Sequence, residues 1–325
     1  MVLSPYLNIL RMSFDCSVNQ PHVPVMADEV VSYLSPVRGQ TLLDMTFGAG
    51  GHTKRLLDAV PDHDVTIFCL DRDPVAHSLA QEMAKKYSGK LIPLFGKFSE
   101  VPQLLMAHGV HFNSFDGILF DFGCSSMQFD VAGRGFAVSK NSFLDMRMNQ
   151  NSDTPTAADI LANAEKKSKQ IARAIIEARY CLKKIQTTQD LGNLVCSATG
   201  IHRATKVFQA LRIFVNDELN EIDFGMVIAD KYLKVGGTLV TLSFHSLEDT
   251  IVKRHIRGNV LESSANPLPL KYVSSSLCLK AEDISDLFHS NWKMLSKHVI
   301  LPSPTEIEQN PRSRSAKLRA AVKIQ

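Results

Sequence analysis

The sequence predicts an α/β fold in which a parallel sheet is interrupted by a helical segment. Apolar stretches alternate with helix-length segments over roughly the first 130 residues, which is typical of strands covered by helices on both faces. Residues 129–205 are polar and helix-prone, with no convincing strand. Strand-like sequence then returns at Gly237. We therefore expect one sheet domain with a helical insertion.

The first half of the chain supplies four candidate strands. They are the apolar, β-branched or aromatic stretches at residues 41–46, 65–70, 91–95 and 117–122. The amphipathic pattern of residues 74–87 predicts a helix between the second and the third strand. Since parallel strands need such crossovers, the order of these elements favours a parallel arrangement.

The second half begins with the insertion and then returns to the sheet. Helices are predicted at residues 157–164 and 168–180, and a third at residues 208–223 leads back to the strand at Gly237. A polar, Ser-rich loop follows from Arg257 to about residue 286, and two short stretches, 294–301 and 318–324, are expected to close the sheet as an antiparallel pair. The predicted division is an N-terminal extension (1–20), a core (21–128 plus 206–325) and an inserted helical domain (129–205).

Composition excludes some classes of protein and leaves others open. The chain has 325 residues, of which 45% are hydrophobic, yet it has no apolar run of the length that a membrane-spanning helix needs. Its six cysteines are scattered without a CxxC pair, which argues against a zinc site or a disulfide framework and indicates a reducing compartment. The formal charge of +3 is too small to indicate a nucleic-acid-binding protein by itself. The first 20 residues leave targeting undecided.

A glycine-rich turn follows the first predicted strand. Gly48, Gly50 and Gly51 allow the backbone to approach a ligand closely, and the next segment has a helical pattern whose N-terminal amides face the turn. The dinucleotide-binding fingerprint requires a third glycine where this chain has Thr53. The turn therefore predicts a nucleotide-like ligand but fits a nicotinamide dinucleotide poorly.

Two acidic residues end neighbouring strands of the predicted sheet. Asp71 lies 20 residues after Gly51, where a carboxylate can accept hydrogen bonds from both hydroxyls of a ribose. The alternative role for Asp71, as the N-cap of the following helix, suits Asp73 better because Pro74 comes next. Asp121 ends the fourth strand at the same edge and is suited to hold an amino group; its alternative role is that of a turn residue.

Several other enzyme classes lack their motifs here. The chain has no GxSxG, HExxH or GxxxxGK[ST] sequence, which leaves hydrolase, zincin and nucleotide-triphosphatase functions without support. The stretch SFHSLED at residues 243–249 contains Ser, His and two acids, but closeness in sequence does not make a triad. Because it follows a strand, we expect it to line the same edge of the sheet.

Eight blocks resemble the MraW/RsmH-type methyltransferases, in family order from residue 22 to the C-terminal region. They are HVPVM (22–26), DMTFGAGGH (44–52), LDRDP (70–74), FDGILFDFGCSS (115–126), LDMRM (144–148), FQALR (208–212) with VN (215–216), SFHSLED (243–249) and NPRSRSAKLR (310–319). The resemblance implies a Rossmann-like class I methyltransferase fold, with a mostly parallel seven-stranded sheet and an inserted helical domain. The insertion is shorter than the family pattern.

The resemblance also implies an activity and its site. The activity is S-adenosylmethionine-dependent methylation of the exocyclic N4 of a cytidine in small-subunit ribosomal RNA. The sequence of residues 122–128 resembles the animal mitochondrial members more than the bacterial ones, which implies a mitochondrial protein; a cytoplasmic protein is the alternative. By the resemblance, the cofactor-binding residues are Gly50, Gly51, His52, Asp71, Phe98, Asp121 and Gln128. No metal is implied.

Other roles stay open between alternatives. Asp121 and His245 are candidates for contacts to the reacting amine. Candidates for phosphate contacts are Arg134, Arg147, Arg212 and Arg254, and for each of them a salt bridge with an acid such as Asp145, Asp217 or Glu248 is an equal alternative. A non-catalytic RNA-binding assembly factor that kept the cofactor pocket is the rival function, and a nicotinamide-dependent dehydrogenase is a third.

Overall fold

A computed structural model describes residues 23–87, 89–151, 153–163, 185–199, 204–258 and 290–325. Its centre is one seven-stranded sheet in the order β3-β2-β1-β4-β5-β7-β6. The first five of these strands are parallel, whereas β7 runs antiparallel to both β5 and β6. The strands are β1 (Thr41–Asp44), β2 (Thr66–Asp71), β3 (Leu91–Phe95), β4 (Phe115–Asp121), β5 (Leu233–Ser243), β6 (Trp292–Met294) and β7 (Lys317–Lys323).

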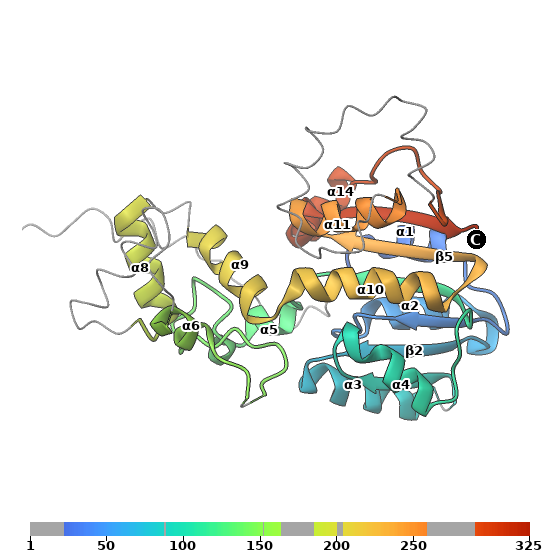
Figure 1. Cartoon of the computed structure of the whole chain (residues 1–325), viewed down its shortest axis with the longest axis horizontal. Helices are drawn as coiled ribbons and strands as arrows, with labels where there is room; N and C mark the ends of the chain where they lie inside the picture. The colour runs from blue at the N-terminus through green and yellow to red at the C-terminus, as the bar shows by residue number, and fades with distance from the viewer. Residues whose placement is uncertain (1–22, 88, 152, 164–184, 200–203, 259–289) are drawn as a thin grey trace, which may run out of the picture.

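Helices cover both faces of the sheet. One face packs against α1 (Ala27–Leu34), α2 (Gly51–Asp58) and α3 (Pro74–Lys86), and the other against α4 (Val101–Ala107), α10 (Glu218–Tyr232) and α11 (Ser246–Ile256) (Figure 1). Neighbouring residues on a strand face opposite sides, so that Leu42 belongs to the first core and Leu43 to the second. Burial on both faces explains the continuous apolar character of these strands.

The predicted sheet is confirmed strand by strand. Each of the four early strands forms within a few residues of its predicted bounds, and the last two stretches pair antiparallel as expected. The stretch at residues 294–301 is only partly a strand, because β6 ends at Met294 and Ile300 contributes an isolated bridge to Leu318. The result is the mostly parallel seven-stranded sheet that the resemblance implies.

One predicted helix is wrong in its extent. The helix expected over residues 208–223 is two helices, α9 (Ala204–Val215) and α10, which meet at Asn216 and Asp217. Asp217 has left-handed backbone angles (φ 51°, ψ 39°), which a continuous right-handed helix cannot contain. The Asn216 side chain bonds to a segment from outside the helix, so a tertiary contact fixes the break.

A separate helical cluster lies beside the sheet. It comprises α6 (Ala157–Asn163), α8 (Thr188–Thr199) and α9, and Figure 1 shows these helices as a group at one end of the sheet domain. Their buried side chains form a core of their own that includes Leu161, Leu191 and Phe208. The packing thus joins α9 to this cluster, whereas the predicted division assigns residues 206–215 to the sheet core. The predicted helix at 168–180 lies outside the described residues.

The carboxyl ends of β1, β2, β4 and β5 meet at one edge of the sheet, on the side of the helical cluster. The glycine turn, Asp71, Asp121 and the SFHSLED stretch therefore come together, as the sequence predicts for ligand sites in open parallel sheets. Within the described part of the chain, none of the helices combines the length and the apolar character that crossing a bilayer requires.

Candidate active site

The glycine turn after β1 has backbone angles that only glycine adopts without strain. Gly48 and Gly50 have φ values of 55° and 79°, and Gly50 is the N-cap of α2. A Cβ on Gly50 would lie 2.6 Å from Phe47 Cζ and 2.7 Å from Met83 Cε. A Cβ on Gly51 would meet Pro24 at 3.1 Å. The turn is therefore packed tightly against Phe47, Met83 and Pro24, which leave no room for a side chain on Gly50.

Asp71 holds this turn against the end of β2. One carboxylate oxygen accepts a hydrogen bond from the Gly48 N–H at 2.7 Å, and the other accepts one from the Asp73 N–H at 2.8 Å. Burial raises the pKa of Asp71 to about 6, although these two N–H groups favour the charged form. Each oxygen keeps a lone pair, so the carboxylate can still accept from two ribose hydroxyls. Asp73 caps α3 through the Val75 N–H, as predicted.

His52 and Asp121 face each other across the ends of β1 and β4. His52 Nε2 lies 3.5 Å from Asp121 Oδ2, and the Asp121 N–H donates to Thr46 Oγ1 at 2.6 Å. Among the described residues, neither His52 ring nitrogen nor Asp121 Oδ1 has a hydrogen-bond partner, although all three atoms are buried. Buried polar atoms without partners are costly. Such atoms fit a site that is completed by a polar ligand, and here they lie beside the glycine turn.

The sequence patterns alone did not reach Gln128 and Phe98, which came from the resemblance. Gln128 is buried and forms a capping box with Ser125 at the start of α5 (Ser126–Asp130), while its Nε2 donates to Asp73 Oδ2 at 2.8 Å. The Ser-x-x-Gln spacing is a capping signal that the sequence contained. Phe98 packs edge-to-face on Phe120, with ring centroids 5.4 Å apart, and no local pattern marks it.

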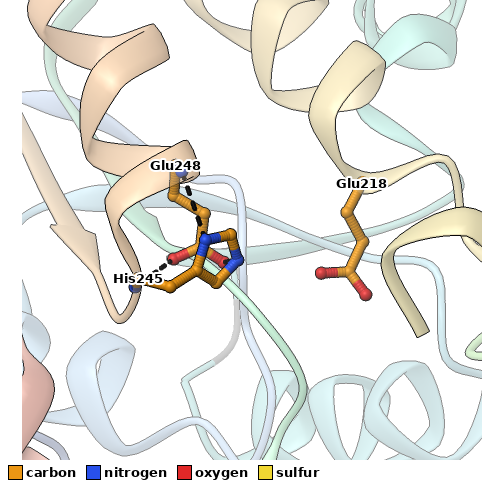
Figure 2. A group of neighbouring side chains, drawn as sticks. All are labelled: Glu218, His245 and Glu248. Carbon is orange, nitrogen blue, oxygen red and sulfur yellow. Dashed lines mark hydrogen bonds and ion pairs between the residues drawn. The ribbon is translucent and has the colours of Figure 1, made fainter. Parts of the chain in front are cut away.

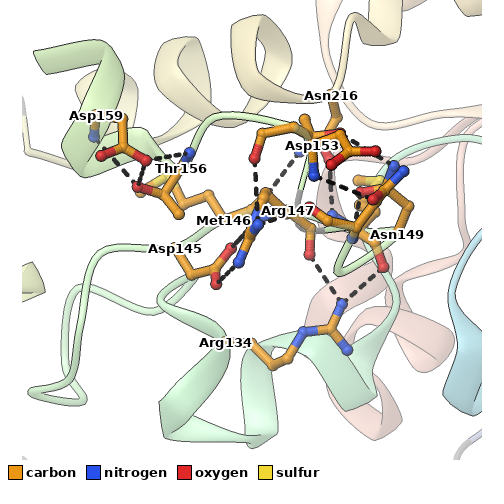
Figure 3. Close-up of polar contacts among 12 residues, drawn as sticks. Arg134, Asp145, Met146, Arg147, Asn149, Asp153, Thr156, Asp159 and Asn216 are labelled. Carbon is orange, nitrogen blue, oxygen red and sulfur yellow. Dashed lines mark hydrogen bonds and ion pairs between the residues drawn. The ribbon is translucent and has the colours of Figure 1, made fainter.

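The structure places two of the four candidate arginines around residues 144–148, which we call the strap. Arg134 has a side chain that is 11% exposed; it forms an ion pair with Asp73 at 2.8 Å and donates to the carbonyls of Arg147 and Met148. Arg147 forks onto both oxygens of Asp145 (Figure 3). Both guanidinium groups therefore bind the chain itself, which is the alternative that the sequence had left open.

The other two candidates, Arg212 and Arg254, stand on α9 and α11. Arg212 forks onto both carboxylate oxygens of Glu218, at 2.8 and 2.7 Å, an acid that is not among the partners named from the sequence. Its Nη2 also lies 3.9 Å from Glu248 Oε1. Arg254, on α11, is half-buried. The phosphate contacts of Arg212 and Arg254 stay a prediction.

The SFHSLED stretch forms the turn from β5 into α11. His245 is the N-cap of α11, with its Nδ1 facing the Glu248 N–H at 3.4 Å, and Glu248 Oε2 accepts from the Phe244 N–H at 2.7 Å. The His245 Nε2 and Glu248 Oε1 atoms lie 2.8 Å apart (Figure 2). The turn lines the same edge of the sheet, as expected, and His245 faces a glutamate rather than a serine, so no triad forms.

His245 and Glu248, together with Glu218 of α10, also have the spacing of a metal site. Atoms of Glu218, His245 and Glu248 all lie within 4.8 Å of one another (Figure 2). Burial raises the pKa of Glu218 above its ordinary value, and the Arg212 guanidinium opposes that shift. Because that guanidinium already engages both Glu218 oxygens, a divalent cation would meet a fixed positive charge. The cluster is better described as a buried polar network around the ion pair of Arg212 with Glu218.

Comparison with known proteins identifies the family. The model of the MraW methylase family matches residues 19–324. The chain belongs to this family. Membership confirms the resemblance carried by the sequence blocks, and together with the strand order it confirms the class I methyltransferase fold. The alternative of a nicotinamide-dependent dehydrogenase is therefore wrong.

Individual relatives agree with this assignment. A Drosophila melanogaster protein named "Probable methyltransferase-like protein 15 homolog" is 51% identical over 98% of this chain and 96% of its own length. The "12S rRNA N(4)-cytidine methyltransferase METTL15" of Mus musculus is 44% identical over 93% of this chain and 82% of its own length. The "Ribosomal RNA small subunit methyltransferase H" of Granulibacter bethesdensis is 40% identical over 92% and 90%.

One similar protein is much longer than this chain. The Culex quinquefasciatus protein named "Putative receptor-type tyrosine-protein phosphatase mosPTP-1" is 53% identical over 94% of this chain, which spans only 22% of that protein. Among solved structures, TrmN from Thermus thermophilus has a TM-score of 0.40 at 10% identity, over 91% of this chain and 48% of TrmN. That likeness is too distant to bear on function.

Proposed function

We propose that the protein methylates the exocyclic N4 of a cytidine in small-subunit ribosomal RNA, with S-adenosylmethionine as the donor. The observation that carries the proposal is the set of buried, unpartnered atoms of His52 and Asp121 beside the glycine turn of a methylase-family fold. The acceptor follows from two relatives given above, one named for the N4 of a cytidine in 12S rRNA and the other for ribosomal RNA of the small subunit.

The residues present fit this donor. Gly50 and Gly51 keep the turn compact, because side chains there would meet Phe47, Met83 or Pro24. His52 offers two ring nitrogens that have no hydrogen-bond partner among the described residues, and Asp71 offers two lone pairs to the ribose hydroxyls. Phe98 provides an apolar ring for the adenine. When bound, the donor supplies a methyl group on a sulfonium centre. The protein's task at this point is to hold that methyl group at the edge of the sheet between β1 and β4.

The acceptor nitrogen decides what the remaining side chains must do. The lone pair of cytosine N4 is delocalised into the ring. The site must therefore orient the amine in line with the methyl group and accept hydrogen bonds from its N–H groups. Asp121 Oδ1, at the end of β4, is a buried acceptor that no described residue bonds to. The bound donor would supply the methyl group, its S–C bond breaking as the N–C bond forms, and the cationic nitrogen would then lose one N4 proton to water. No strong base is required.

We place the activity in mitochondria, because the Mus musculus relative is named for 12S rRNA. The domain division stays part of the proposal: the sheet domain holds the donor, and the helical cluster meets the RNA. The partner is then small-subunit ribosomal RNA or the subunit that contains it.

Methyl transfer to RNA separates this proposal from its rival, a non-catalytic assembly factor. Purified protein is incubated with methyl-labelled donor and small-subunit ribosomal RNA, and the labelled nucleoside is identified by mass spectrometry. We expect N4-methylcytidine, and an Asp71→Ala variant that loses about 10- to 1000-fold in donor affinity. Asp28→Ala is the matched control, since Asp28 is an exposed acid on α1.

Two results would contradict the proposal in different ways. Donor binding without any label in RNA, from protein that is folded, favours the assembly factor. Label on a nucleoside other than N4-methylcytidine would keep the methyltransferase and change its acceptor. Compartment is tested separately, by the location of the tagged protein in cells.

A further inference from the structure

Arg212 has a guanidinium group that is shared between three parts of the fold. It stands on the last turn of α9, and its Nε and Nη2 atoms donate to the two oxygens of Glu218 on α10. Its Nη1 donates to Cys124 Sγ at 2.9 Å, in the loop after β4. Burial raises the pKa of the Cys124 thiol to about 12, so the sulfur remains a neutral thiol. One side chain thus connects α9, α10 and the end of β4.

The same guanidinium approaches the turn after β5. Its Nη2 lies 3.9 Å from Oε1 of Glu248, a side chain that is fully buried. The other Glu248 oxygen accepts from the Phe244 N–H at 2.7 Å, and His245 Nε2 lies 2.8 Å from Oε1 (Figure 2). Arg212, Glu218, His245 and Glu248 therefore form one network, which we call the ion-pair network.

The ion-pair network borders the loop that follows Asp121, the residue for which we propose a contact to the acceptor amine. Gly123 and Cys124 come directly after the Asp121-Phe122 pair, and Gly123 has a φ of 102°. A Cβ on Gly123 would lie 3.8 Å from Arg212 Nη2 and 3.8 Å from Glu248 Oε1. Loop residues 123–125, which we call the acceptor loop, thus contact the guanidinium through Cys124 Sγ and pass close to the Glu248 carboxylate at Gly123.

A phosphate contact by Arg212 conflicts with this arrangement. Its side chain is 12% exposed, and three of its nitrogens already donate to Glu218 or Cys124. The adjacent carboxylates of Glu218 and Glu248 also balance its charge, which reduces its attraction for RNA. A long side chain committed in this way positions its neighbours rather than binding a mobile anion.

We propose that Arg212 is a positioning residue that fixes the acceptor loop between β4 and the β5–α11 turn. It acts through the Cys124 thiol and the Glu248 carboxylate, and its fork onto Glu218 fixes the guanidinium plane. The reacting amine must meet the methyl group within a fraction of an ångström, so a loose acceptor loop slows transfer without weakening the binding of donor or RNA. This inference rests on the proposed function.

The test compares Arg212→Lys and Arg212→Met with the wild type. Measurements are kcat, the KM for RNA, the Kd of S-adenosylhomocysteine, and the slope of log RNA affinity against log salt. We expect kcat to fall at least tenfold in both variants, because lysine keeps the charge but cannot fork. The Kd of S-adenosylhomocysteine, the RNA affinity and the salt slope should stay within about twofold of the wild type.

A phosphate contact gives the opposite pattern and would overturn the inference. Arg212→Met would then reduce the salt slope by about one and raise KM, while Arg212→Lys would restore both. Unchanged kcat in Arg212→Lys would also overturn it. Absence of transfer by the wild type would instead refute the proposed function, so the two failures are distinguishable.

A second pair of variants covers the case in which Arg212 variants fail to fold. Cys124→Ala removes one guanidinium contact without leaving a charge unpaired, and Cys124→Ser keeps an acceptor at the same place. We expect kcat to fall severalfold in Cys124→Ala and to recover in Cys124→Ser, with the Kd of S-adenosylhomocysteine unchanged in both. Equal kcat in the alanine variant and the wild type would contradict the role of this contact.

Discussion

Donor binding should weaken as the pH falls from 7 to 5, because Asp71 must be ionised to accept the ribose hydroxyls. Burial raises the pKa of Asp71 to about 6, against an ordinary value of 3.8, while the N–H groups of Asp73 and Gly48 limit the shift. The neutral carboxyl group carries a proton on one oxygen and loses an acceptor. A change of two pH units therefore removes the binding-competent form from most molecules.

The size of the effect follows from the fraction of ionised Asp71. With a pKa of about 6, roughly nine-tenths of the carboxyl groups are ionised at pH 7 and roughly one-tenth at pH 5. The apparent Kd is the intrinsic Kd divided by the competent fraction. The Kd should therefore rise about tenfold between pH 7 and pH 5. This window stays below the pKa of about 8 of the ligand's own amino group.

Calorimetric titration with S-adenosylhomocysteine at several pH values measures this dependence. The Asp71→Asn variant is the matched control: it should bind more weakly at pH 7, and its Kd should not change between pH 7 and pH 5. A constant wild-type Kd over the same range would refute the reasoning. If Asp71→Asn kept the tenfold dependence, a group other than Asp71 would be its source.

The remaining predictions concern packing and anchoring, and denaturant unfolding measures each. Gly50→Ala should lower the free energy of unfolding by about 2–5 kcal/mol. Gly39 has nearly the same φ (78° against 79°), and a Cβ there would have no atom of the described residues within 4 Å, so Gly39→Ala should lower that free energy by only about 1 kcal/mol. Equal losses would contradict the predicted clash. Arg134→Met should lower the free energy of unfolding by about 3–5 kcal/mol, because the buried Asp73 carboxylate loses its ion partner. Arg38→Met breaks an exposed pair with Asp62 and should lower it by less than about 1 kcal/mol. Asn216→Ala should lower the free energy of unfolding by about 2–4 kcal/mol and speed hydrogen exchange of the backbone amides in the strap. Unchanged exchange there would contradict the role of the Asn216 side chain in holding the strap.

The sheet and its ligand edge could be predicted because their signals are local. Apolar stretches, helix-length connections and a glycine turn fix the order of parallel strands, and parallel strands bring Asp71 and Asp121 to one edge. Asp73 and Pro74 mark the start of α3 by a capping rule that depends only on neighbouring residues. These features need no knowledge of distant contacts.

Other features could not be predicted, because a partner far away in the chain decides them. The break between α9 and α10 depends on Asn216, whose amide bonds to the backbone of Met146 and Met148 about 70 residues earlier. Helical propensity alone favours a continuous helix across this point. The roles of Arg134 and Arg212 similarly depend on carboxylates that the sequence does not place next to them, so their surroundings, rather than their charge, assign their roles.

The last turn of α9 gives two of these features one physical cause. Arg212 and Asn216 are four residues apart, which places them on the same face of a helix, and the Asn216 amide also donates to the Arg212 carbonyl at 2.9 Å. Arg212 reaches the acceptor loop, while Asn216 accepts from the Met148 N–H at 2.8 Å in the strap (Figure 3). A shift of α9, which packs in the helical cluster, would therefore displace the acceptor loop and the strap together. If RNA binds the helical cluster, its docking would reach the acceptor loop and the strap through this turn.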